Sequence, residues 1–452
     1  MSIERVCIRS VDQHEAEFIE MAKAIWENPE VGYKEFFASQ LYAEALKKYG
    51  FAVELGAFGM PTAIRAVWGK GYPSIGFCGE YDALPGLSQK LVPHKEPVVE
   101  GGVGHGCGHN LLGVGCLAAA VALKEELEST GKEGTVVFYG TPAEELLTGK
   151  GFMAKEGAFR DVDVMIAWHP GAASRISLGS MNGVEGLVVK FHGKTAHAAM
   201  NPQDGRSALD ALQLMNMGVE FLREHVTSDI RIHYVITRGG MVPNIVPDLC
   251  EGKYMVRGLD REVIVDVMNR VKDCAEGAAK MTGTTVEFVP EGGVYPTMQN
   301  KVLADVMQQV REQLPAIEYT EEELKWADEM NRTNPRFREG MVPVDSTVLP
   351  VIYANNAASS DFGDVMHIVP AVNITETTSA LLSGGHSWMI TACSGSSIGF
   401  KGMLRAGKVM AAGAMALVDD HSLVEKAKEE FKQAMKGTEY ICPITDDIPK
   451  PF

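Results

Sequence analysis

Several features that mark specialised classes of protein are missing from this sequence. There is no uncharged apolar run of about 18 residues that could cross a membrane, and residues 1–11 lack the hydrophobic core of a signal peptide. The eight cysteines are scattered along the chain, unlike the dense spacing of a disulfide framework. No long run of Lys and Arg is present, and the net charge of -17 disfavours a phosphate backbone as partner. We therefore expect a cytoplasmic protein with reduced thiols that binds neither nucleic acid nor membrane.

What is present is an ordinary globular composition in a long chain. With 452 residues, of which 46% are apolar, the chain can bury a large core and is expected to form more than one domain. In its first part, predicted strands and helices alternate, a pattern typical of an α/β fold. The predicted helices of this part are 14–26, 35–49, 111–127 and 150–156.

Three buried strands are each followed at once by polar residues. These strands and residues are 73–79 with Glu80 and Asp82, 134–140 with Glu144 and Glu145, and 164–168 with His169. In open α/β sheets, ligands bind beyond the carboxyl ends of the strands. We therefore expect these side chains to lie together at one edge of a sheet.

A glycine-rich loop contains one thiol and two imidazoles. It runs from Gly104 to Asn110, immediately before the helix predicted over 111–127. Glycines allow the backbone to turn several side chains toward one point at a helix N-terminus. Cys107 as thiolate and His109 as neutral imidazole are good ligands for a divalent cation. By itself, the stretch is equally compatible with a glycine-rich loop that contains a small buried cysteine.

The adjacent carboxylates of Glu144 and Glu145 favour a metal site, because one can bind a metal while the other acts as base on metal-bound water. Such pairs are also common on solvated helix faces, but this one follows a buried strand. His386 lies in a second glycine-rich loop, and His169 could alternatively be a core residue bonded to a backbone carbonyl.

The candidate ligands outnumber those of one closed site. They are Cys107, His109, Glu145, His169 and His386, whereas a closed tetrahedral site uses four. Five ligands suit two metals that share one of them, and a thiolate can bridge. We therefore expect two divalent metal ions per chain, Mn²⁺ or Zn²⁺, with Cys107 between them.

The pattern changes after Asn182 to the order β-α-β-β-α-β, the ferredoxin-like split unit of a compact inserted domain. Its predicted elements are strands 186–192, 231–238, 249–257 and 284–289 and helices 206–225 and 261–281. We expect an inserted domain at 184–295 and a catalytic domain formed by 1–183 and 296–452. The latter should include helices 301–314, 320–331 and 402–418 and strand-like pieces near Val351 and Val372, whereas 334–350 has no assignable structure.

The sequence resembles the two-metal peptidases and amidohydrolases that include carboxypeptidase G, the aminoacylases and the auxin-conjugate hydrolases. More narrowly, it resembles the aminobenzoyl-glutamate utilisation protein B group, through "GEYDALPGLSQ", "GHGCGHNLLG", "WHP", "AHAA" with "GRSALDA", "ASSDFGDV" and "KGMLRAGKVMAA". These segments span nearly the whole chain. The resemblance implies a mixed-sheet, two-metal exopeptidase-like catalytic domain with an inserted ferredoxin-like lid or dimerisation domain.

The resemblance also implies roles for individual residues. Cys107 would bridge the metals, His109 and His169 would bind one metal, Glu145 and His386 would bind the other, Glu144 would be the general base, His197 would stabilise the tetrahedral intermediate, and Asn244 and Arg257 would bind the substrate carboxylate. A guanidinium suits that last task because it binds a carboxylate bidentately, although a solvated arginine at a strand end is the simpler interpretation of Arg257 alone.

Two positions depart from the pattern of relatives or fall outside it. Many relatives have a histidine ligand two residues before the aspartate matched by Asp82, but this chain has Glu80 there. Glu80 is expected to bind metal weakly or only to contact a ligand, and Asp82 is expected to orient one. His105 matches no ligand position and is expected to be structural.

The implied function is a metal-dependent amidohydrolase that cleaves the amide of an N-acyl amino acid, first of all p-aminobenzoyl-glutamate, by attack of a metal-bridging water. Other N-acyl amino acids or dipeptides are alternative substrates. A thiol hydrolase with nucleophile Cys107 and base His109 would leave three ligands without a role. A non-catalytic metal-binding protein would not need Glu144. Because His197 lies in the inserted domain, we expect a homodimer through that domain with shared sites, and a related second subunit is the alternative.

Overall fold

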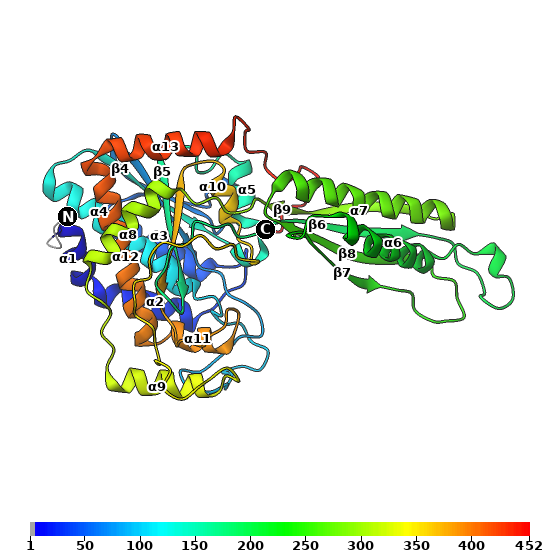
Figure 1. The fold of residues 1–452 in the computed structure, drawn as a ribbon, viewed down its shortest axis with the longest axis horizontal. Helices are drawn as coiled ribbons and strands as arrows, with labels where there is room; N and C mark the ends of the chain where they lie inside the picture. Colours follow the sequence, from blue (N-terminus) through cyan, green and yellow to red (C-terminus); the bar gives the residue numbers. More distant parts are fainter. Residues whose placement is uncertain (1–4) are drawn as a thin grey trace.

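The structure, a computed structural model, describes residues 5–452, so the first four residues of the predicted catalytic domain lie outside it. Figure 1 shows a rounded body from which a long, narrow unit projects. The body contains a six-stranded sheet and the projecting unit a four-stranded sheet. Among the described residues, no helix is long and apolar enough to cross a membrane.

The sheet of the body is mixed, as the predicted fold class requires. Its order is β1-β2-β4-β3-β5-β10, with β1 and β2 antiparallel to their neighbours and the other strands parallel. The strands are β1 (Ala52–Leu55), β2 (Ile64–Lys70), β3 (Ser74–Glu80), β4 (Gly134–Thr141), β5 (Val164–Gly171) and β10 (Ala371–Thr377). The predicted strands correspond to β3, β4, β5 and β10. The sequence did not predict β1 and β2. Most residues of β1 and the last residues of β2 are exposed or half-buried, so neither strand has a continuous buried apolar run.

Helices cover both faces of this sheet. On one face, α4 and α12 pack against the central strands, together with the N-terminal helices and α8. On the other face lie α5, α10 and the C-terminal segment. The helices of the body are α1 (Val6–Gln13), α2 (Glu15–Glu27), α3 (Phe36–Lys48), α4 (His109–Thr130), α5 (Gly149–Lys155), α8 (Lys301–Gln313), α9 (Glu321–Arg332), α10 (Phe362–Met366), α11 (Trp388–Ser394), α12 (Ser397–Asp419) and α13 (His421–Met435).

Three expectations for the C-terminal half need correction or extension. The prediction of a strand-like piece near Val351 is wrong, since Ile352 forms only an isolated bridge to Ser177. The helix predicted over 402–418 is the later part of the longer α12, and the sequence did not predict α13. The unassigned stretch 334–350 contains no helix or strand, only turns and a single bridge at Val348.

The projecting unit has the predicted β-α-β-β-α-β order. Its elements are β6 (Gly183–His192), α6 (Ala208–Leu222), β7 (Arg231–Arg238), β8 (Leu249–Gly258), α7 (Arg261–Thr282) and β9 (Thr285–Val294). The antiparallel strands lie in the order β7-β8-β6-β9. Both helices pack on one face of this sheet and enclose a core of their own. The ends near Gly183, Gly258 and Val294 adjoin the body, and the other ends point away from it (Figure 1).

A buried ion network joins β3, α5 and the start of α10 at the carboxyl end of β3. The Lys150 Nζ atom lies 2.7 Å from Glu80 Oε1 and 2.5 Å from Asp361 Oδ1, and the Lys150 backbone N–H donates to Asp361 Oδ2. All three side chains are buried. Because unpaired charges are costly inside a protein, the single ammonium keeps two carboxylates in place.

A strained turn after β4 delivers Glu144 and Glu145. The residues on either side, Ala143 and Leu147, have positive φ angles of 58° and 55°, which non-glycine residues adopt only when their surroundings impose it. Glu35, at the start of α3, accepts a hydrogen bond from the Ala143 N–H at 2.8 Å and another from the Thr62 hydroxyl. Burial, and after it the charge of Asp82, raises the pKa of Glu35 to about 8. Glu35 therefore holds the turn as a neutral carboxylic acid near pH 7.

We expect Lys150→Met to lower the free energy of unfolding, because it leaves Glu80 and Asp361 buried without a cation. Breaking a buried pair typically costs about 3–5 kcal/mol. Lys155→Met is the matched control: it removes the same charge from the same helix, and among residues 5–452 Lys155 pairs only with the fully exposed Asp446. Urea unfolding of both variants measures the difference. Equal losses would show that the network does not stabilise the fold.

We expect the stability of Glu35→Gln to depend less on pH than that of the wild type. The pKa of Glu35 is about 8 in the folded protein and near 4.5 without its surroundings. Its stabilising contribution is therefore complete below about pH 4.5 and is lost as the pH rises toward 8. Gln keeps the neutral shape, so the wild type should lose up to about 1.4 kcal/mol more per pH unit in this window. Urea unfolding at several pH values, with a chelator present, would refute this if both slopes agree.

Candidate metal centre

The five predicted ligands converge at the carboxyl ends of the parallel strands. These five ligands form two groups of three whose ligand atoms lie within 4.8 Å of one another, and Cys107 belongs to both. One group is Cys107, His109 and His169, and the other is Cys107, Glu145 and His386. The side chains come from the loop before α4, the first residue of α4, the turn after β4, strand β5 and the loop before α11.

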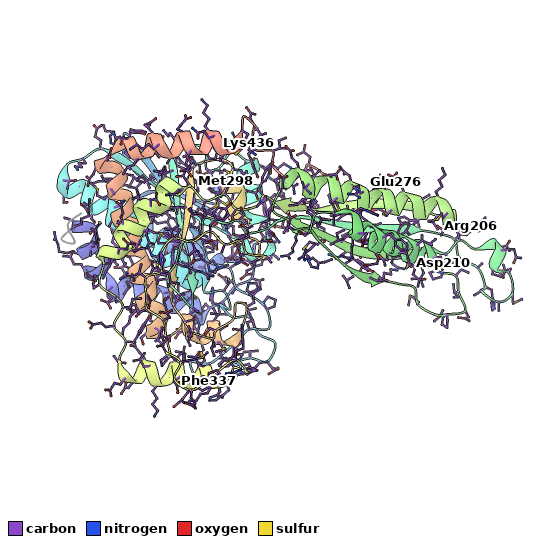
Figure 2. All side chains as sticks on the ribbon, in the orientation of Figure 1. Arg206, Asp210, Glu276, Met298, Phe337 and Lys436 are labelled. Atoms are coloured by element: carbon purple, nitrogen blue, oxygen red, sulfur yellow. The ribbon has the colours of Figure 1, made fainter. Side chains whose placement is uncertain are left out.

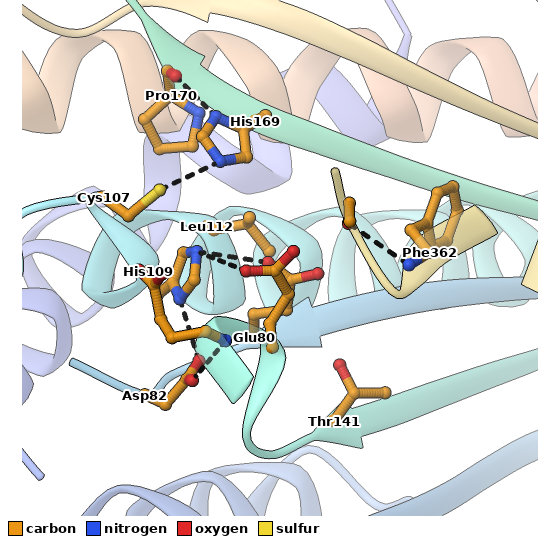
Figure 3. A network of polar contacts seen from close by, with 12 residues as sticks. Glu80, Asp82, Cys107, His109, Leu112, Thr141, His169, Pro170 and Phe362 are labelled. Atoms are coloured by element: carbon orange, nitrogen blue, oxygen red, sulfur yellow. Dashed lines mark hydrogen bonds and ion pairs between the residues drawn. The ribbon is translucent and has the colours of Figure 1, made fainter. Parts of the chain in front are cut away.

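Asp82 orients two members of this cluster. The His109 Nδ1–H donates to Asp82 Oδ1 at 2.9 Å, and the backbone N–H of Glu145 donates to Asp82 Oδ2 at 2.9 Å. With Nδ1 bonded to Asp82, the Nε2 atom of His109 points toward the carboxyl group of Glu80, as Figure 3 shows. This buried nitrogen has no hydrogen-bond partner among the described residues. This geometry suits a histidine that binds a cation through Nε2.

His169 is oriented in the same way by a backbone carbonyl. Its Nδ1–H donates to the Pro170 oxygen at 2.7 Å, and its Nε2 lies 3.3 Å from Cys107 Sγ. Burial raises the pKa of the Cys107 thiol to about 12, which the neighbouring His109 only partly offsets. A thiol with such a pKa is a poor nucleophile near neutral pH unless a cation holds the thiolate. This observation argues against the thiol-hydrolase alternative.

His386 and Glu145 form the more accessible half of the cluster. The His386 Nε2 atom lies 3.3 Å from Glu145 Oε2, and the histidine side chain is 59% exposed. The backbone N–H of His386 donates to the Gly106 oxygen, which ties its loop to the loop of Cys107. Glu145 Oε1 is buried without a hydrogen-bond partner among the described residues. Sulfur, imidazole and carboxylate donors with such unpartnered atoms fit two divalent cations.

Glu80 and Glu144 approach His109 from a third side. The His109 Nε2 atom lies 3.3 Å from Glu80 Oε2 and 3.9 Å from Glu144 Oε2, and the three residues form a further candidate group. The other oxygen of Glu80 is held by Lys150. Burial raises the pKa of Glu144 well above its ordinary value, and the charges of Glu80 and Asp361 act in the same direction. His105 belongs to none of the groups, and burial lowers its pKa to about 3.

The predicted catalytic residue His197 and the predicted substrate-binding residues Asn244 and Arg257 do not all lie together. His197 and Asn244 are neighbours, since the Ala198 N–H donates to the Asn244 oxygen and His197 bridges Ile245. Both are exposed, beyond the outer ends of β6 and β8. The pairing of Lys194 with Arg206 places this segment near Arg206, which Figure 2 shows at the far end of the projecting unit.

Arg257 lies at the opposite end of β8, next to the body. Its Nη1 atom is 3.4 Å from the Ser359 hydroxyl. A strand rises roughly 3.4 Å per residue, so the stretch of β8 from Leu249 to Arg257 alone spans roughly 27 Å. His197 and Asn244 therefore cannot bind the same small molecule as Arg257 in this arrangement of one chain.

Sequence reasoning missed the charged residues that support the centre. Glu35, Lys150 and Asp361 were given no role, although Asp361 lies in the motif "ASSDFGDV". The one local signal was a lysine between two glycines, Gly149 and Gly151, six residues after Glu144. Its carboxylate partners lie 70 positions upstream and 211 positions downstream, so nothing nearby in the sequence identifies them.

The chain is similar to several known proteins. A model of the peptidase family M20/M25/M40 matches residues 76–449. One relative, a subunit of the p-aminobenzoyl-glutamate hydrolase of Escherichia coli, is 36% identical over 471 residues, covering 98% of each chain. Another, the Xaa-Arg dipeptidase of Mus musculus, is 29% identical, covering 95% of this chain and 92% of its own.

A solved structure supports the fold. It is a dinuclear metal-binding peptidase of the M20 family from Bacillus subtilis, with a TM-score of 0.61 at 17% identity, covering 90% of this chain and 99% of its own. At that identity the likeness establishes the fold only. The family resemblance expected from the motifs is confirmed by the family model and by the relative at 36% identity. The chain belongs to the peptidase family M20/M25/M40 and is a metal-dependent amidohydrolase or peptidase.

Proposed function

We propose that this protein hydrolyses the amide bond of an N-acyl amino acid, with p-aminobenzoyl-glutamate as the first candidate substrate. The observation that carries the proposal is the pair of ligand groups sharing Cys107, with Glu144 beside them but outside both. The E. coli relative is named as part of a hydrolase of p-aminobenzoyl-glutamate, and the mouse relative as a dipeptidase. Other N-acyl amino acids and dipeptides are the alternative substrates.

The ligand assignment follows the two groups. Cys107 belongs to both and would be shared by two cations, with His109 and His169 available to one and Glu145 and His386 to the other. When bound, two divalent ions, Mn²⁺ or Zn²⁺, would lower the pKa of water toward ~7 and polarise the amide carbonyl. Asp82 keeps His109 and the Glu145 backbone oriented for this task.

Glu144 is the proposed general base. Its buried carboxyl group, next to the cluster and with a raised pKa, is suited to take a proton from the attacking water and pass it to the leaving amine. His197 is suited to the oxyanion, because its Nδ1 accepts hydrogen bonds from the backbone N–H groups of Ala199 and Met200. The proton of its ring therefore sits on Nε2, which remains free to donate.

The inserted domain, residues 184–295, would be both lid and dimerisation domain on the catalytic domain of 1–183 and 296–452. Its edge strand β7 and the neighbouring helix α6 expose apolar side chains, including Val235, Ile236 and Phe221. An open edge strand beside an apolar surface suits pairing with a second copy about a two-fold axis. The distance between Asn244 and Arg257 adds a second reason, since a partner could supply His197 and Asn244. The name of the E. coli relative, a subunit, makes a related second chain the alternative partner.

We expect Glu144→Gln to retain two metals and to lose several powers of ten in kcat, because water held at the centre lacks its base. Glu145→Gln should lose metal affinity, since a ligand is removed. Elemental analysis, combined with amine release from a panel of N-acyl amino acids in added Mn²⁺ or Zn²⁺, measures both. The reverse outcome would exchange the two roles, and a wild type that releases no amine from any substrate would reject the proposed function.

We expect His197→Ala and Glu144→Ala each to be nearly inactive alone, but to recover roughly a quarter of wild-type activity after co-refolding in equal amounts. About half of the dimers would then be mixed, and each mixed dimer has one intact site of two. A mixture of Glu144→Ala with Cys107→Ala is the matched control, because both changes lie in the catalytic domain and no intact site can form. A mixture that forms mixed dimers but stays inactive would reject the shared site.

A further inference from the structure

The projecting unit is joined to the body through a narrow base. The chain enters the unit at Gly183 and leaves it at Val294. These two crossings lie side by side, because Val294 is the register partner of Val184. A methyl group added at Gly183 would lie only 2.8 Å from Pro296 Cδ. Within residues 5–452, no helix or strand of the body packs along a helix or strand of the unit. The orientation of the unit therefore depends on a few local contacts at its base.

One side chain is wedged into this base from a distant part of the sequence. Ile444 belongs to the segment 436–452, which follows α13 and ends at the junction of body and unit (Figure 1). Its side chain is buried between Gly292 of β9 and Gly151 of α5. A methyl group added at Gly292 would lie 2.8 Å from Ile444 Cδ1, and one added at Gly151 would lie 2.9 Å from Cγ1. Because such a packed contact leaves no free space, the unit cannot tilt toward α5 without displacing Ile444.

The residues next to Ile444 in sequence attach it to both sides of the junction. Tyr295 directly follows β9, and its ring centroid lies 5.1 Å from that of Tyr440. The Tyr295 hydroxyl also accepts a hydrogen bond from the Ile441 N–H at 3.3 Å. On the body side, the Cys442 thiol donates to the Gly151 oxygen at 3.3 Å. The wedge is therefore fixed to α5 of the body and to the exit of the projecting unit.

The same junction reaches the turn that carries Glu144 and Glu145. A methyl group added at Gly292 would lie 3.8 Å from Cγ2 of Thr148, which directly follows this turn. The Thr148 hydroxyl shares a hydrogen bond of 2.6 Å with the Tyr33 hydroxyl, and the Tyr33 ring lies 5.3 Å from the ring of Phe452. The base of the unit, the segment 436–452 and the end of the turn therefore pack together.

The base controls a long lever, because His197 lies beyond the outer end of β6. A strand rises roughly 3.4 Å per residue, so β8 spans roughly 30 Å, and a rotation of about 10° at the base would move the outer end by about 5 Å. A misplacement of about 1 Å at a reacting group can cost about 100-fold in rate. A histidine at the outer end can therefore act on a substrate only if the angle at the base is held within narrow limits.

We propose that Ile444 is a positioning residue, which holds the projecting unit at the angle from which His197 reaches the metal centre of a second copy. The inference rests on the proposed function, which assigns the oxyanion to His197, and adds a residue that acts through it. Ile444 itself contacts β9 and α5, not the metal ligands. An isoleucine suits this task because branching at Cβ leaves its side chain few rotamers. A smaller side chain at position 444 would leave the unit free to tilt.

The kinetic test is a size series at position 444, measured in the metal-loaded enzyme. Ile444→Ala should lower kcat about 10- to 100-fold with KM unchanged, and Ile444→Val, which keeps the branch at Cβ, less than about threefold. Ile441→Ala shortens a 75% exposed side chain of the same segment and should change kcat by less than about twofold.

A double-mutant comparison separates positioning from a merely structural role. In a His197→Ala background, Ile444→Ala should lower the residual kcat by less than about twofold, because the side chain that it positions is gone. Equal losses in both backgrounds, or no loss in the wild-type background, would overturn the positioning role.

A measurement without turnover separates this inference from the proposed function. Spin labels on noncanonical amino acids at the exposed positions Glu276 on α7 and Arg336 on the body report the angle of the unit, in labelled chains diluted with unlabelled ones. Ile444→Ala should broaden the distribution of distances between the labels, whereas Ile441→Ala should not. Broadening in a protein that cleaves no amide would reject the proposed function but keep Ile444 as the residue that holds the unit. Amide cleavage with a distribution that Ile444→Ala leaves unchanged would reject the inference and leave the function intact.

Discussion

The hydrogen bonds of Asp82 set the geometry on which the centre depends. One oxygen fixes the ring of His109 and the other fixes the backbone of Glu145, so a single carboxylate aligns residues from α4 and from the turn after β4. Two residues before this aspartate the chain has Glu80, whose carboxylate lies 3.3 Å from the other ring nitrogen of the same histidine.

The centre gathers far more negative than positive charge, and this excess explains the surrounding structure. Five carboxylates surround His109 and Lys150, namely Glu80, Asp82, Glu144, Glu145 and Asp361. The buried Lys150 forms ion pairs with two of them, Glu80 and Asp361. Carboxylates that are buried without compensation take up protons, as the raised pKa values of Glu144 and Glu145 indicate. A pair of divalent cations would reverse this tendency. The same acidic surroundings mean that an anionic substrate would need a local cationic group.

The fold class and the ligand cluster could be predicted because their signals are local in sequence. Cys107 and His109 sit two residues apart in a glycine-rich loop, and Glu144, Glu145 and His169 directly follow apolar strands. The residues that support the centre had no such signal.

Glu35 bonds to a backbone group more than 100 residues away, and Lys150 bonds to Asp361 across 211 positions. Residues of this kind are defined by long-range pairing, which composition and periodicity do not encode.

The placement of the strands along the chain determines which sheet can be completed first during synthesis. The sheet of the body takes β10 from residues 371–377, after the whole projecting unit, whose four strands all lie between residues 183 and 294. During synthesis on the ribosome, all strands of the projecting unit's sheet are therefore made before the sheet of the body is complete. Until β10 is made, the edge of β5 that pairs with it stays unpaired. During that interval, four of the five proposed metal ligands are already present, and His386 has yet to be made.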